Sequence, residues 1–214
     1  MSLGIFKVLG IIVFLYLTWR NLKDDYQEDK LITYSWLALI GFMVFGRIGF
    51  GLIHWGTWGN LADWVSVWNK PGISYISAYL GLMLVTFWYG RLQDWKFLSF
   101  MENNINSFLV FLSFLMVDEF LRAKMDLKPL VYLVILIVIG FVAGMVKKRY
   151  RSFVWYKSGK KGFTFLFGNF LTFLMLSISF LVMGEKITNL VLALIISLIS
   201  IVGLFILGDV KKKI

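Results

Sequence analysis

Cysteine is absent from this chain of 214 residues, and histidine occurs once, at His54. The missing cysteines exclude disulfides, thiolate nucleophiles and thiolate metal ligands, and one histidine cannot build a histidine-based metal cluster. A glycine-rich phosphate loop, a dinucleotide fingerprint and the internal repeat of an inverted-repeat transporter are also missing from the sequence. We therefore expect no metal site and no cofactor.

Apolar residues dominate what is present. They make up 59% of the chain, only two residues are proline, and the mean hydropathy is +0.79. This is more apolar surface than a soluble domain of this length can bury, so the sequence predicts an all-α membrane protein, 1–214 forming a single transmembrane domain. The first run lacks a small-residue cleavage site, and we expect it to be a retained helix. The seven predicted spans are 3–19, 31–53, 73–90, 98–121, 129–146, 163–183 and 189–208.

The basic residues predict how the spans are oriented. Fifteen of the 22 Lys and Arg residues fall on one side of the predicted spans, six on the other side, and Arg47 within a span. By the positive-inside tendency, the side with fifteen is cytoplasmic, which puts the amino terminus outside and the carboxyl terminus in the cytoplasm of a bacterial cell with the protein in its cytoplasmic (inner) membrane. The net charge of +10 has the same explanation, so we expect no nucleic-acid partner. The basic run 147–161 is interpreted as a topology anchor, with a lipid-headgroup site as the alternative.

Arg47 is the most informative residue of the sequence. An ionisable group inside the hydrocarbon costs ~3 kcal/mol on insertion scales, so it needs a carboxylate, a wet cavity or an anionic ligand. Arg47 precedes His54 by seven residues, which puts it about 10 Å below the outer end of the second span at the rise of a helix. Its small neighbours Gly46 and Gly49 allow a helix or a ligand to approach the backbone. The alternatives are an ion pair with another helix, or snorkelling outward.

Polar groups from two further spans are predicted at the same outer level. Because they come from independent helices, they favour an intramembrane cavity that binds a phospholipid, although each alone could be an interfacial, packing or capping residue. They are Ser74, Tyr75, Ser77 and Tyr79 in the third span, and Asp118 and Glu119 at the end of the fourth.

Two other segments are notable. The outer connection 55–72 places Leu61, Trp64, Val65 and Trp68 on one helical face, which predicts a short interfacial helix, either a gate for lipid or a passive anchor. The inner start of the fourth span is polar, and we interpret its polar side chains as hydrogen-bonding to neighbouring helices. They are Glu102, Asn103, Asn104 and Asn106. A hydrolase triad built from His54, Asp63 and a serine is disfavoured, because spacing alone supplies no aligned hydrogen bonds.

Two segments resemble the bacterial prolipoprotein diacylglyceryl transferase family. They are Gly46-Arg47-Ile48-Gly49-Phe50, followed by a tryptophan-rich outer connection, and Pro71-Gly72-Ile73-Ser74-Tyr75-Ile76-Ser77-Ala78-Tyr79-Leu80-Gly81. The basic loop before Gly162 and Phe165 is similar to the family's entry into its sixth span. The resemblance implies seven spans and an enzyme that moves the diacylglyceryl group of phosphatidylglycerol to the lipobox cysteine of a prolipoprotein. Arg47 would hold the lipid phosphate.

The chain departs from the family where the chemistry is expected. Ile76 stands where the family has a histidine, and a placement of the fourth-span motif that ends on Glu119 puts Phe111 at the position of an arginine. The sixth span has no charged residue between Phe165 and Met183. Losing groups that stabilise charge should cost several kcal/mol in the transition state. The alternative is therefore a non-catalytic relative that binds a phospholipid, a lipoprotein or another membrane protein.

The predicted site is thus made of phospholipid-binding and catalytic candidates. Arg47, Gly46, Gly49, Ser74, Ser77 and Tyr79 are the phospholipid-binding candidates, and Glu119, Asp118 and Tyr75 are the residues that could replace the missing histidine. Small-solute transport is a third class of function, but it needs a continuous polar path that the spans do not contain.

Overall fold

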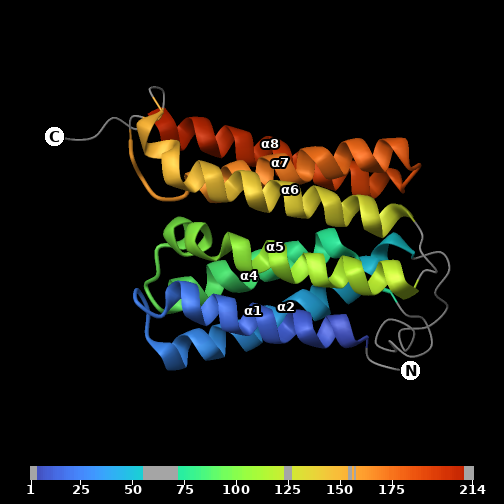
Figure 1. The fold of residues 1–214 in the computed structure, drawn as a ribbon, viewed down its shortest axis with the longest axis horizontal. Helices are drawn as coiled ribbons and strands as arrows, with labels where there is room; N and C mark the ends of the chain where they lie inside the picture. Colours follow the sequence, from blue (N-terminus) through green and yellow to red (C-terminus); the bar gives the residue numbers. More distant parts are fainter. Residues whose placement is uncertain (1–3, 55–71, 123–126, 154–155, 157, 210–214) are drawn as a thin grey trace. The chain divides into compact units, whose positions relative to one another are not determined.

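A computed structural model describes residues 4–54, 72–122, 127–153, 156 and 158–209. In these residues helices joined by short connections are the only regular secondary structure, with no strand (Figure 1). The helices are α1 (Ile5–Leu22), α2 (Glu28–Ile53), α4 (Tyr75–Leu92), α5 (Phe97–Arg122), α6 (Leu127–Arg149), the short 3-10 helix η2 (Tyr150–Ser152), α7 (Phe163–Val182) and α8 (Ile187–Asp209).

Each predicted span coincides with one α-helix, and the all-α multi-pass membrane class is confirmed. Within the described residues, six helices are long and apolar enough to cross a membrane. The exception is α4, whose 18 residues include three tyrosines and Arg91, which lower its hydropathy. The count of seven crossings therefore stays a prediction, and it depends on α4.

Local sequence explains where several helices begin. Glu28 and Asp29 in the first turn of α2 complement the positive end of its dipole. Ser74 is the N-cap of α4, and its side chain accepts a hydrogen bond from the N–H of Ser77. The N-cap of α7 is Gly162, whose φ of +122° is a conformation that side-chain-bearing residues rarely adopt. The entry into α7 thus requires glycine.

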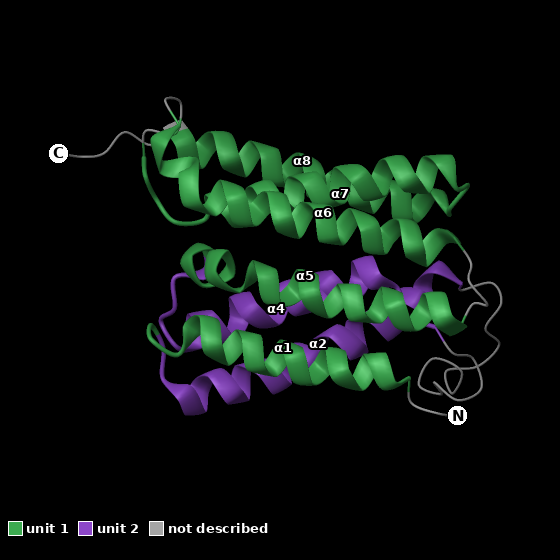
Figure 2. Cartoon of the chain, in the orientation of Figure 1, with its two compact units in different colours: residues 1–25, 98–214 green, residues 26–97 purple. Residues whose placement is uncertain are grey.

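The helices form two compact units, residues 26–97 and residues 1–25 with 98–214 (Figure 2). In the smaller unit, α2 and α4 pack antiparallel. The N–H of Ser74 donates to the carbonyl of Gly46 at one end (3.0 Å), and the hydroxyls of Tyr34 and Thr86 lie 2.9 Å apart towards the other. Tight contact between apolar helices is what stabilises a pair in lipid, where burial of apolar surface contributes little.

In the larger unit, α1 packs against α5, and α6, α7 and α8 lie side by side (Figure 1). The ring of Phe14 lies 5.3 Å from that of Phe108, and the side-chain amide of Asn21 donates to the Ser107 hydroxyl at 3.1 Å. Tyr150, Tyr156, Phe163 and Leu204 form a buried cluster that joins η2 and the following loop to α7 and α8.

The contacts show which helix ends meet inside this larger unit. The carboxyl ends of α1, α6 and α8 meet the amino ends of α5 and α7, because Asp25 contacts Asn103, Tyr150 contacts Glu102, and Leu207 lies against Gly162. At the opposite ends, Lys7 pairs with Asp118 and Lys128 pairs with Glu185. The predicted alternation of helix direction is thus seen within the unit.

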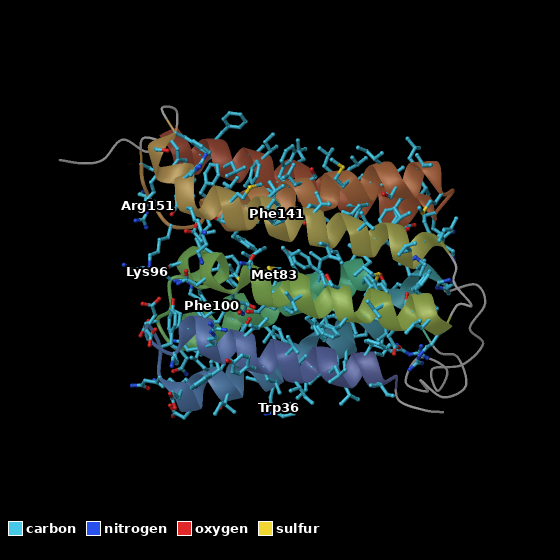
Figure 3. All side chains as sticks on the ribbon, in the orientation of Figure 1. Trp36, Met83, Lys96, Phe100, Phe141 and Arg151 are labelled. Atoms are coloured by element: carbon cyan, nitrogen blue, oxygen red, sulfur yellow. The ribbon has the colours of Figure 1, made fainter. Side chains whose placement is uncertain are left out.

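Apolar side chains line the outward faces of the helices. On α6, Ile137 and Phe141 are exposed, as are Leu198, Ile199 and Phe205 on α8. Figure 3 shows side chains made almost entirely of carbon along the helices, with nitrogen and oxygen gathered towards the helix ends. Surfaces of this kind face lipid, so the protein is a multi-pass membrane protein.

Candidate functional site

Arg47 is buried on α2, with 7% of the residue exposed. Its Nη1 donates a hydrogen bond of 3.1 Å to the carbonyl oxygen of Gly72, and its guanidinium lies 5.9 Å from the centre of the Phe50 ring. That ring occupies the space beside the α-carbon of Gly72 that a side chain would fill. Arg47 is therefore held near the start of α4, because Gly72 precedes the N-cap by two residues.

The amino end of α4 supplies hydrogen-bond donors at the same place. The hydroxyls of Ser74 and Ser77 lie 3.1 Å apart, and the N–H of Ser77 reaches the Ser74 hydroxyl at 3.5 Å. The first N–H groups of a helix have no partner within the helix, and they carry the positive end of its dipole. A cationic side chain, a helix amino terminus and two hydroxyls together form an arrangement suited to an anion.

The two candidate glycines contribute by packing. A side chain at Gly46 would meet Ile73 and Ala78, and one at Gly49 would overlap the Ser77 hydroxyl. The sequence left open the approach of a helix or of a ligand at these glycines, and the structure shows the approach of a helix. Gly46 and Gly49 therefore position α4 against α2.

The remaining candidates divide between the two units. Tyr75 and Tyr79, half-buried residues one turn apart on α4, belong to the unit that contains Arg47, whereas Asp118 and Glu119 belong to the larger unit. Asp118 is buried, and its Oδ2 lies 2.8 Å from Nε of Arg122 and 3.7 Å from Nζ of Lys7. Through these contacts the Asp118 carboxylate joins the start of α1 to the end of α5.

Asp118 also lies directly against the backbone at the start of α1. A side chain at Gly4 would overlap the Asp118 carboxylate. Gly4 is the N-cap of α1, so the carboxylate stands next to the positive end of that helix. Glu119, the next residue along, is half-buried.

A second polar centre, at the amino end of α7, was not among the candidate site residues predicted from the sequence. The carboxylate of Glu102 is buried, and it accepts hydrogen bonds from the Tyr150 hydroxyl (2.8 Å), the N–H of Gly162, and the N–H of Thr164 (3.4 Å). Glu102 on α5 therefore acts as the cap of α7. The sequence does show a carboxylate within one span and a glycine just before another. It does not show that these two residues, 60 positions apart, contact each other.

Polar neighbours surround this cap. The amide of Asn103 donates to Asp25 at 3.1 Å, and its carbonyl oxygen accepts from Nζ of Lys147 at 3.4 Å. The prediction that this polar stretch of α5 hydrogen-bonds to neighbouring helices is thus confirmed for Glu102 and Asn103. The α1, α5 and α6 ends are joined by these bonds.

The predicted interfacial helix at 55–72 lies, apart from Gly72, outside the described residues. Among the residues that the structure describes, no group of three or more Asp, Glu or His side chains is placed to hold a metal ion. Comparison with protein-family models and with curated proteins finds no match to the chain.

Proposed function

We propose that this membrane protein binds the phosphate of a membrane phospholipid beside Arg47 and the amino end of α4. The observation that carries the proposal is the buried guanidinium of Arg47, held next to the first turn of a second apolar helix. An arginine at membrane depth costs ~3 kcal/mol, and charged groups there mark substrate and ligand pathways. An anionic headgroup drawn inward would offset that cost.

Phosphate fits this arrangement better than a neutral ligand does. Arginine presents a planar fork of donors that matches phosphate oxygens, and helix amino termini bind phosphate through their N–H groups. The Ser74 and Ser77 hydroxyls add two adjustable donors within reach of one another. A phosphodiester with a polar headgroup would accept hydrogen bonds from the guanidinium, from the helix N–H groups and from the hydroxyls.

The side of the membrane follows from the basic residues. With fifteen cations on the predicted cytoplasmic side, the end of α2 that carries Arg47 lies in the outer leaflet of a bacterial cytoplasmic membrane. Anionic phospholipid is the expected ligand there, with phosphatidylglycerol as the first candidate.

Diacylglyceryl transfer is the second candidate function. The two segments that resemble the transferase family contact each other, since Gly46 bonds to Ser74 and Arg47 bonds to Gly72. A transferase of this kind would take phosphatidylglycerol as donor and a prolipoprotein cysteine as acceptor. Ile76 in place of the family's histidine favours lipid binding without transfer, possible partners being a lipoprotein or another membrane protein.

Lipid retained through purification tests the proposal. Native mass spectrometry of the detergent-solubilised protein should find bound phosphatidylglycerol, and Arg47→Gln should retain less of it than wild type while keeping its thermal unfolding transition. Arg91→Gln is the matched control, because Arg91 is an exposed arginine at the other end of α4. If Arg47→Gln does not fold, Arg47→Lys is the second variant. It keeps the positive charge without the planar guanidinium, and should bind phosphatidylglycerol more weakly than wild type. A folded Arg47 variant with undiminished lipid contradicts the proposal.

Transfer is tested separately, in liposomes with labelled phosphatidylglycerol and a lipobox peptide. Label that moves to the peptide thiol, and stops moving in Arg47→Gln, would support the transferase. Retained lipid without transfer would leave the non-catalytic binding function.

A further inference from the structure

Five exposed basic side chains lie where α6 ends and α7 begins. They are Lys148, Arg149, Arg151, Lys160 and Lys161, which we call the basic plate. In the part of the chain that the structure describes, no carboxylate lies within 4.0 Å of any of the five. Arg151 is seen beyond the end of α6 in Figure 3. Among the described residues, no ion pair therefore cancels the charge of the plate.

The plate rests on a packed scaffold. The rings of Tyr150 and Phe163 stack with centroids 5.1 Å apart, and the Tyr156 ring meets Phe163 edge-on at 4.8 Å. The Tyr156 hydroxyl donates to the carbonyl oxygen of Lys160 at 2.7 Å, and the N–H of Lys160 donates to the hydroxyl of Ser158 at 3.3 Å. The backbone that presents Lys160 is thus held in place by buried groups.

Glu102 also holds this scaffold in place through hydrogen bonds. Its carboxylate accepts from Tyr150, which precedes Arg151, and from Gly162, which follows Lys161. Glu102 is buried, and its negative charge stabilises the amino end of α7. The Nε of Arg151 donates to the Tyr150 hydroxyl at 3.4 Å, so this cation of the plate is held on the same scaffold. Both ends of the basic segment are therefore attached to one residue of α5.

We infer that the basic plate is a docking surface for the anionic phospholipid headgroups of the leaflet at this end of the helices. The plate stands at the ends of two apolar helices, which is the level of the headgroups, and its charge complements theirs. Each cation near an anionic membrane surface contributes on the order of a fivefold gain in affinity. The role exceeds that of a topology signal, because a topology signal needs charge but no packed scaffold.

The site is separate from Arg47, and its test is run in the Arg47→Gln background so that the two sites are not confused. Delipidated protein in mixed micelles is titrated with phosphatidylglycerol, with phosphatidylcholine as the neutral reference, and thermal unfolding is followed by tryptophan fluorescence. The lipid concentration at half-maximal shift in Tm reports binding. Only the phosphatidylglycerol series should raise Tm.

Two triple variants remove equal charge. Lys148→Gln with Lys160→Gln and Lys161→Gln should weaken phosphatidylglycerol binding on the order of a hundredfold, from three cations. Lys23→Gln with Arg91→Gln and Lys96→Gln, exposed residues assigned to the same side of the membrane, should change it by only a few-fold. Equal effects of the two triples would overturn the inference.

Glu102→Gln tests the scaffold, because it keeps all five cations. We expect about tenfold weaker binding from the loss of fixed geometry, whereas a surface that works by charge alone would bind as well or better. Polyphosphate and polyglutamate serve as soluble polyanions. If either raises Tm as phosphatidylglycerol does at equal charge, the occupant is a soluble partner and the lipid assignment is wrong.

Discussion

Replacing Glu102 with alanine removes the acceptor of three hydrogen bonds at the amino end of α7. The Tyr150 hydroxyl and the N–H groups of Gly162 and Thr164 would be left without their acceptor in a buried place. Each such orphaned group costs about 1–3 kcal/mol, and partial rehydration at the helix end reduces the sum, so we expect a loss of about 3–5 kcal/mol. For a chain of this size that corresponds to a fall in Tm of roughly 10 °C.

Glu185→Ala is the matched control. Its carboxylate pairs with Lys128 at 3.1 Å, but the two side chains are 27% and 42% exposed, and pairs of this kind contribute about 0–1 kcal/mol. Glu102→Gln should fall between the two, with a loss of about 1–2 kcal/mol, since the amide keeps an acceptor but not the charge.

Thermal unfolding in detergent, followed through the nine tryptophans, measures all three variants. Thiol-reactive dyes cannot serve, because the chain has no cysteine. If Glu102→Ala lowers Tm no more than Glu185→Ala does, the carboxylate does not cap α7.

Three further predictions concern packing, orientation and pH. Gly49→Val should lower Tm by several degrees because α4 fills the space beside Gly49, whereas Gly144→Val, with no side-chain neighbour within 4 Å, should leave Tm nearly unchanged. Cysteines introduced one at a time at Lys160 and Glu185 should be labelled by an impermeant maleimide from opposite sides of the membrane, and labelling from one side would refute the alternation of helix ends. Burial raises the pKa of Tyr156 to about 12 from its ordinary value of 10, so its neutral form favours the folded state. That contribution is complete below pH 10 and is lost as the pH rises to 12; wild type should therefore lose Tm relative to Tyr156→Phe across this window, and parallel curves would contradict it.

Hydropathy was enough to predict the helices. Long apolar runs have one stable form in lipid, so every span that the sequence predicted falls on an α-helix, and the boundaries differ by a few residues. The exception in hydropathy, α4, carries the polar residues that made it a candidate site. The polar residues that make α4 a candidate site therefore also lower its hydropathy below that of the other membrane spans.

Among the predicted site residues, the structure brings together those that lie on adjacent segments. Arg47 meets Gly72, and Gly49 meets Ser77, because α2 and α4 pair across a single connection. Asp118, which the sequence offered as a replacement for the missing histidine or as a cap of its span, contacts Lys7 and Arg122. Its pairing with Lys7 involves a helix more than a hundred residues away in sequence, and no local pattern specifies it.

Glu102 also sets an order for assembly. Its partner Gly162 follows it by 60 residues, so α5 leaves the ribosome well before the amino end of α7 exists. Until then the carboxylate is more stable hydrated at the membrane surface, because an unpaired charge in the lipid costs ~3 kcal/mol on insertion scales. Arrival of α7 replaces that water with backbone N–H groups and closes the end of the bundle. The cap of α7 is thus supplied by a helix that was made before it.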